Sequence, residues 1–158
     1  MVFALNYDLA QATAFVKVEL GAPVLRNPNF LKFINLLAQL NKSGRIPQKE
    51  CRACGKIYCD LDQYIWDTEA KAQTMEDAGG VMSKAFTMLY RNCSCGNTLV
   101  LTLTGEIFPE ISEFWNMIRS EAQVSGLPVR DVVLSFMNDW EDRINRNHAG
   151  SKKTKRKS

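Results

Sequence analysis

This 158-residue sequence contains a single histidine, no long apolar run and no segment with the features of an export signal. A membrane-spanning helix needs about 18 or more consecutive apolar residues, and no stretch here approaches that length. The N-terminus, from Met1 to Asp8, lacks the basic start and the apolar centre of a signal peptide. We therefore expect no membrane association and a location inside the cell, in the cytoplasm.

The motifs of several enzyme classes are also missing. The sequence has no glycine-rich phosphate loop and no nucleophile motif. Catalytic zinc sites keep an open position and usually include histidine or carboxylate ligands, and zinc deaminases need a His-x-Glu element. The only histidine, His148, lies close to the C-terminus. The sequence therefore predicts no catalytic residues, no organic cofactor and a protein that is not an enzyme.

Cysteine is the residue type with an informative pattern. All five cysteines lie between residues 51 and 95, and four of them form two close pairs, Cys51 with Cys54 and Cys93 with Cys95. Each pair is followed by a glycine, which allows the backbone to turn with a positive φ so that N–H groups point at sulfur. An odd number of cysteines and no export signal favour metal binding over disulfides. We predict that these four thiolates bind one Zn²⁺ in a closed, structural site.

The residues around the pairs predict β-hairpins. Residues 85–91 and 98–104 flank the second pair and are rich in β-branched and aromatic residues, which indicates a hairpin with ligands at its tip. Residues 57–59 and 64–66, after the first pair, are compatible with a second hairpin. Two ligand-tipped hairpins that face each other resemble a zinc ribbon, over about residues 48–104. This resemblance implies a metal-binding role for the four paired cysteines.

Two features depart from the commonest zinc-ribbon pattern. The second pair has one intervening residue in place of two, and 38 residues separate Cys54 from Cys93. Within this insertion we expect a helix near residues 68–77 that ends at the two glycines that follow. These departures leave the four-cysteine site intact but do not indicate a particular ribbon subfamily.

Cys59 lies outside both pairs. Because tetrahedral zinc takes four ligands, one of the five cysteines is spare. The plain interpretation of Cys59 is a half-buried structural cysteine on a strand. The alternatives are a substitute metal ligand, a redox-responsive thiol or a ligand of an iron–sulfur cluster. The cysteine spacing reverses the order of the plant-type ferredoxin pattern, which favours zinc over iron.

Helices are expected before and after the cysteine stretch. Asn27 is a good N-cap and Pro28 suits the first helical position, so a helix should run from there to about Lys42. Two further helices should begin near Pro109 and Pro128. Only a few residues connect them, so they should be neighbours in space, as a helical hairpin or a sharper corner.

The segment from Asp8 to Leu20 predicts a short N-terminal helix. Its last five residues, Val16-Lys17-Val18-Glu19-Leu20, alternate apolar and charged side chains and would also suit a strand.

Charge is distributed unevenly along the chain. Residues 1–142 carry 13 basic and 17 acidic side chains, a net charge of −4, whereas residues 143–158 carry seven basic side chains and no acidic one. The polar C-terminal tail should be disordered in isolation. It can attract phosphates without reading sequence, and a solubilising role is an equal alternative. The candidate nucleic-acid contacts are Lys152, Lys153, Lys155, Arg156 and Lys157.

We therefore expect an α+β fold with zinc-ribbon-like hairpins and helices on either side. The expected organisation is a single domain over 1–146, with N-terminal helices in 1–47, the ribbon-like module in 48–104, a helical hairpin in 105–146 and a disordered basic tail in 147–158. The favoured function is a non-enzymatic zinc-binding adaptor or regulator that binds protein partners through its helices. The alternatives are a nucleic-acid-binding accessory or transcription-related factor, and a redox- or metal-responsive sensor that uses Cys59.

Overall fold

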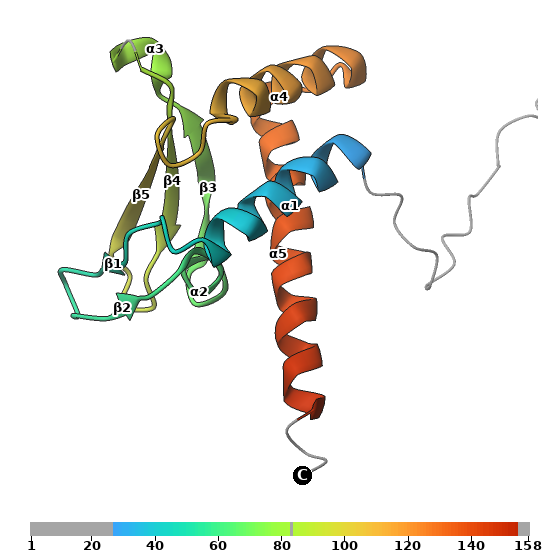
Figure 1. The fold of residues 1–158 in the computed structure, drawn as a ribbon. Helices are drawn as coiled ribbons and strands as arrows, with labels where there is room; N and C mark the ends of the chain where they lie inside the picture. The colour runs from blue at the N-terminus through green and yellow to red at the C-terminus, as the bar shows by residue number, and fades with distance from the viewer. Residues whose placement is uncertain (1–26, 83, 155–158) are drawn as a thin grey trace, which may run out of the picture.

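The computed structural model describes residues 27–82 and 84–154 (Figure 1). The helix expected over residues 8–20 lies outside this part of the chain, as do three of the tail cations, Lys155, Arg156 and Lys157. The elements in chain order are α1 (Pro28–Lys42), β1 (Lys49–Glu50), β2 (Ile57–Tyr58), α2 (Leu61–Trp66), β3 (Glu69–Asp77), α3 (Gly79–Met82), β4 (Phe86–Asn92), β5 (Thr98–Thr104), α4 (Ile111–Ser125) and α5 (Val129–Thr154).

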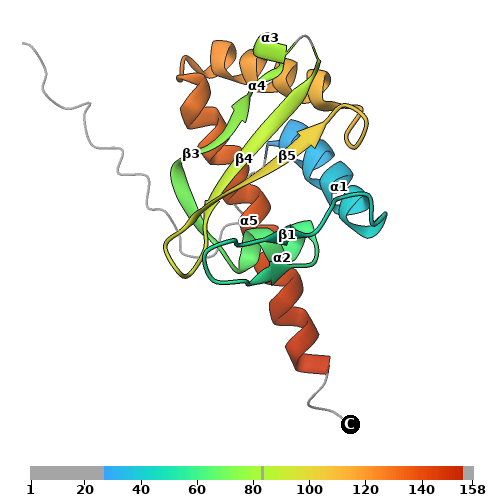
Figure 2. The same ribbon diagram turned by 90° about the vertical axis from the view of Figure 1, so that its left-hand side faces the viewer.

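The fold is α+β, as predicted, and is built on a three-stranded antiparallel sheet in the order β3-β4-β5. The helices α1, α4 and α5 lie on one face of this sheet, and Figure 2 looks onto the other face. In β5, Leu99, Leu101 and Leu103 are buried while the residues between them are exposed or half-buried. This alternation places one side of the strand against the helices.

Aromatic side chains join the helices to each other in the core. Phe30 and Phe33 of α1 contact Phe136 of α5 and Phe114 of α4, with ring centroids 5.6 and 5.4 Å apart. Phe114 and Phe136 also pack edge to face at 4.9 Å. The same continuous buried cluster extends through the sheet and α2 and includes two of the paired cysteines. The cysteine-bearing hairpins and the helices therefore share one core.

The predicted starts of α1, α4 and α5 and the predicted end of α1 agree with the structure to within two residues. The side chain of Asn27 caps α1 by accepting from the Asn29 amide at 2.9 Å, and α1 ends at Lys42. Gly126 ends α4 with a φ of +69°. The end of α5 differs from the prediction, because the helix continues past the expected limit at residue 146 as far as Thr154. The stacking of His148 on Trp66 of α2, with centroids 4.1 Å apart, contributes to holding this extension in place.

Two predictions for the segment between the cysteine pairs are wrong. Residues 64–66, expected in a strand, belong to α2, which Asp60 caps by accepting from the Gln63 amide at 2.8 Å. Residues 68–77, expected to be helical, contain the strand β3, which pairs with β4. The partner of β2 is instead β1, which precedes the first cysteine pair.

A buried arginine connects the sheet to two helices. Arg91 of β4 is only 2% exposed. Its guanidinium donates to the carbonyl oxygens of Ile65 and Thr68 at 2.7 and 2.8 Å and to the Thr68 hydroxyl at 2.9 Å. It also forms an ion pair with Glu141 of α5. Arg91 thus supplies hydrogen-bond donors to the carbonyl groups at the C-terminal end of α2 and fixes that helix against β4 and α5.

Within the described residues, no helix combines the length and the apolar character that crossing a membrane requires.

Candidate metal centre

The first cysteine pair lies in the turn that joins β1 to β2. The Cys51 amide donates to the Lys56 carbonyl at 2.8 Å, and the Gly55 amide donates to the Cys51 carbonyl at 2.7 Å. Gly55 has a φ of +77°, a conformation that side-chain-bearing residues rarely adopt. The glycine after Cys54 therefore allows the chain to reverse directly behind the second sulfur.

The second pair lies in the turn that joins β4 to β5 and follows the same plan. The Cys93 amide donates to the Asn97 carbonyl at 2.9 Å, and the Gly96 amide donates to the Cys93 carbonyl at 2.8 Å. Gly96 has a φ of +87°. This turn continues the β4–β5 register, so a long hairpin places Cys93 and Cys95 at its end.

The two turns bring the four predicted ligands together. The Sγ atoms of Cys51, Cys54, Cys93 and Cys95 all lie within 4.8 Å of one another. The Cys51–Cys95 and Cys54–Cys93 sulfur pairs are each 3.6 Å apart. Sulfurs arranged as a tetrahedron about 2.3 Å from a central ion are about 3.8 Å apart. The cluster therefore has dimensions that could hold one metal ion.

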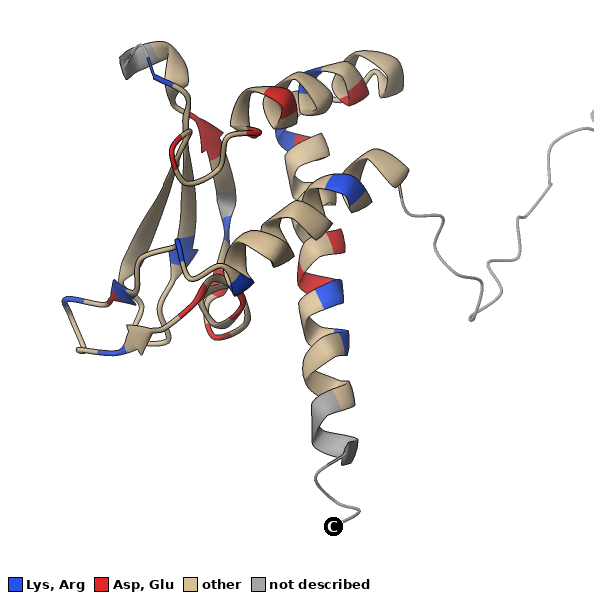
Figure 3. Cartoon of the chain, viewed as in Figure 1, with Lys and Arg blue, Asp and Glu red and all other residues tan. Residues whose placement is uncertain are grey.

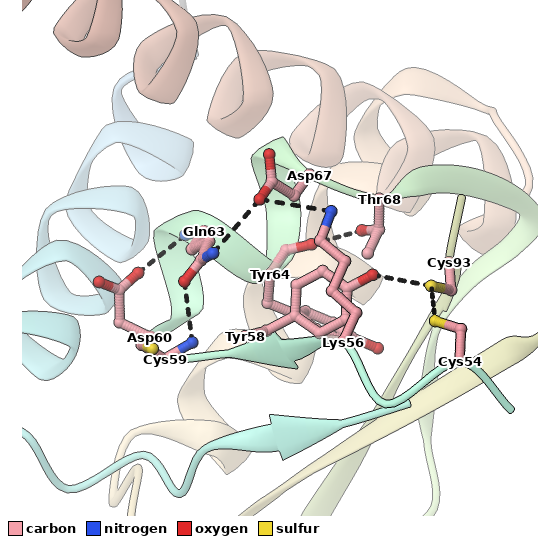
Figure 4. Close-up of polar contacts among 10 residues, drawn as sticks. All are labelled: Cys54, Lys56, Tyr58, Cys59, Asp60, Gln63, Tyr64, Asp67, Thr68 and Cys93. Atoms are coloured by element: carbon pink, nitrogen blue, oxygen red, sulfur yellow. Dashed lines mark hydrogen bonds and ion pairs between the residues drawn. The ribbon is translucent and has the colours of Figure 1, made fainter. Parts of the chain in front are cut away.

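Two side chains that sequence reasoning missed donate to these sulfurs. The Tyr58 hydroxyl donates to Cys93 Sγ at 3.0 Å, and both groups are buried (Figure 4). The Asn97 amide nitrogen donates to Cys51 Sγ at 3.6 Å. Tyr58 is two residues from the first turn and Asn97 directly follows the second, and neither position carries a sequence signal of its own. Such donors stabilise thiolates and orient ligands.

The pKa values of the thiols diverge because they crowd one another. The Cys95 backbone amide and the Tyr58 hydroxyl outweigh burial and lower the pKa of Cys93 to about 6. Burial raises the pKa of Cys51, but backbone amides and Asn97 outweigh it, so that pKa is lowered overall. The Lys56 amide lowers the pKa of Cys54, yet the neighbouring thiols and burial raise it to about 12.

The divergence of these pKa values indicates that the cluster needs a cation before all four thiols can ionise. Four thiolates this close cannot all be charged without a cation between them, because like charges at short range disfavour ionisation. A divalent ion at the centre removes the repulsion and keeps all four sulfurs deprotonated. The donor set thus fits a soft or borderline metal ion.

Cys59 is not a member of the cluster. It is exposed and follows β2 directly, and Figure 4 shows it apart from Cys54 and Cys93. Its backbone amide donates to the Gln63 side chain at 2.9 Å, so its position belongs to the start of α2. The expectation of a half-buried cysteine on a strand is therefore wrong in both respects.

Comparisons of the chain with protein-family models, curated proteins and solved structures find no match. The geometry of the cysteine cluster is consequently the main support for a function.

Proposed function

We propose that the protein is a non-enzymatic zinc-binding adaptor, in which a structural Zn²⁺ holds a scaffold that binds a protein partner. The observation that carries the proposal is the cluster of four cysteine sulfurs. Thiolate sets of this size are typical of closed structural zinc sites, whereas catalytic sites leave one position for water. A reducing, intracellular compartment would keep these thiols available for metal.

The arrangement of the hairpins supports a zinc-ribbon-like centre. Each cysteine pair lies at the tip of an antiparallel hairpin, with β1–β2 on one side and β4–β5 on the other. The first hairpin has only two residue pairs and is too short to be stable alone. A metal shared with β4–β5 would supply the missing stabilisation.

The α4–α5 corner is the surface that we assign to the protein partner. Val124 is 84% exposed and Leu127 is 50% exposed, on either side of Gly126. Exposing large apolar side chains to water is unfavourable, and exposed apolar patches often mark interfaces. Elsewhere the surface carries mixed charge, with basic residues on the β1–β2 turn and acidic residues around α2 (Figure 3).

The metal proposal predicts the composition of the purified protein. Protein prepared without oxygen or added metal should contain one zinc ion per chain, because four thiolates bind zinc tightly near neutral pH. Elemental analysis combined with protein quantification measures this ratio. A brown, iron-loaded preparation would instead assign the cluster to iron–sulfur chemistry.

The adaptor proposal predicts that the corner is needed for partner binding. The double substitution Val124→Asp with Leu127→Asp should weaken capture of the host partner at least about tenfold, because burying two unpaired carboxylates in an interface is costly. Ile57→Asp is the matched control, since Ile57 is 49% exposed on β2. Quantitative affinity capture from the host compares the three proteins. Loss in the Ile57 variant alone would place the interface on the hairpins.

A further inference from the structure

A cleft of about 600 Å³ lies between β3 and the helices α4 and α5. Its β3 wall consists of four consecutive residues, 74–77. Successive side chains of a strand point to opposite faces of the sheet, so a cleft on one face would contact every second residue. A cleft that contacts four consecutive residues must instead lie along the edge of the strand. β3 is an outer strand of the sheet (Figure 2). The cleft, which residues 74–77 line, therefore lies along its free edge.

The hydrogen-bond pattern shows which backbone groups face the cleft. The Ala78 amide donates to the Phe86 carbonyl of β4 at 3.1 Å, and the register pairs Glu76 with Met88. Bonded positions alternate in an antiparallel pair. The N–H and C=O groups of Met75 and Asp77 therefore point away from β4, in the direction of the cleft. They can pair with a further strand.

A buried hydroxyl in the same wall also lacks a partner. Thr74 is 2% exposed, and its Oγ1 makes no hydrogen bond within the described part of the chain. Buried polar groups in native proteins are nearly always paired. The wall of the cleft therefore contains a polar group that the described residues leave unsatisfied.

The facing wall is largely apolar, with charge at its margin. It consists of residues from α4 and α5: Trp115, Arg119, Val129, Arg130, Val133 and Leu134. Val129 is 42% exposed although it lies beside buried Val133. Arg119 pairs with Asp77 at 2.9 Å across the cleft. The cleft suits an extended segment with apolar residues on one side and charged residues on the other.

The chain contains such a segment. In residues 16–20, Val16, Val18 and Leu20 alternate with Lys17 and Glu19. We propose that residues 16–20 of the same chain occupy the cleft as a fourth strand beside β3. The three apolar side chains would face the α4–α5 wall, and Lys17 would lie on the outer face of the sheet near Glu76.

The connection to α1 is long enough for this arrangement. The Asn27 side chain donates to Glu121 of α4 at 2.7 Å, so the described chain begins against α4 itself. Trp115 and Arg119 in the cleft wall belong to the same helix, at most six residues from Glu121, or about 9 Å along its axis. Residues 21–26 can span about 20 Å when extended, enough to pass around a helix about 10 Å wide.

Amide exchange by NMR on the full-length, metal-loaded protein tests this proposal. The Met75 and Asp77 amides should be protected in the wild type and exchange at least about tenfold faster in Val18→Asp, which places a charge against the apolar wall. Val2→Asp is the matched control, with the same substitution outside residues 16–20, and should leave both rates unchanged. The Leu89 amide within β4 reports whether the sheet remains folded. If Val18→Asp loses that protection too, Val18→Thr replaces it, with an expected acceleration of about threefold.

Equal exchange rates at Met75 and Asp77 in the wild type and the folded Val18 variant would overturn the proposal. Sedimentation of the same samples tests whether the added strand comes from the same chain or from a second copy. A monomeric wild type supports docking within one chain. A dimer that dissociates in Val18→Asp would overturn it in favour of a second copy.

Discussion

Replacing Cys51 with serine should leave the protein unable to keep its native core at room temperature. Cys51 is fully buried and belongs both to the four-cysteine cluster and to the hydrophobic core. Structural zinc contributes about 10–16 kcal/mol of apparent binding free energy to small sites, which is comparable with the whole stability of a typical domain. Near-ultraviolet circular dichroism and thermal unfolding should show a lost or much weaker cooperative transition, together with loss of bound metal.

The control for this experiment is the same substitution at Cys59. Because Cys59 is exposed and outside the cluster, Cys59→Ser should change the free energy of unfolding by no more than about 0.5 kcal/mol and retain the metal. Equal damage from the two substitutions would mean that the ligand set has been assigned incorrectly. A chelator should reproduce the effect of Cys51→Ser on the wild-type protein, because metal binding and folding are coupled.

Replacing Arg91 with methionine should destabilise the protein by about 3–5 kcal/mol. The substitution removes the ion pair with Glu141 and leaves the carbonyl oxygens of Ile65 and Thr68 without their donor in a buried region. Unfilled buried acceptors are costly even where the lost hydrogen bonds were individually modest. Urea denaturation of the metal-loaded protein measures the loss.

Two further variants separate burial from charge. Arg91→Lys keeps the charge but cannot reproduce the forked geometry, so we expect an intermediate loss. Arg119→Met removes a comparable ion pair, with Asp77, but the Arg119 side chain is 51% exposed. Its effect should stay below about 1 kcal/mol. Similar losses for Arg91→Met and Arg119→Met would show that the buried network is not the source of stability.

The cluster of four cysteines could be predicted from sequence because close cysteine spacing followed by glycine reflects local geometry. The helices α1 and α4 were likewise predictable, since their caps and apolar faces are local features. The structure of the segment between the two cysteine pairs could not be predicted in this way. Glu69–Asp77 is rich in residues with high helix propensity, yet pairing with β4 makes it a strand. Tertiary contacts decided its structure.

The sequence contains a signal for the helix α2, which was predicted as a strand. Asp60 followed three residues later by Gln63 has the pattern of a capping box, and the Asp60 carboxylate does accept from the Gln63 amide. The aromatic and β-branched residues that follow outweighed this pattern in the prediction. The role of Arg91 could not be foreseen, because its partners lie 23 to 50 positions away.

The distance between the cysteine pairs also bears on how the chain folds. Cys93 and Cys95 come together through the local β4–β5 hairpin, whereas the first pair is 38 residues away. Contacts between distant segments form more slowly than local ones, so the hairpin should form first and offer half of the site. A metal ion bound by both pairs would then act as a reversible cross-link that closes residues 55–92 into a loop. This loop contains β3, whose sequence has the least local preference for its final structure, so the metal would tie together the two ends of the segment that most needs the constraint.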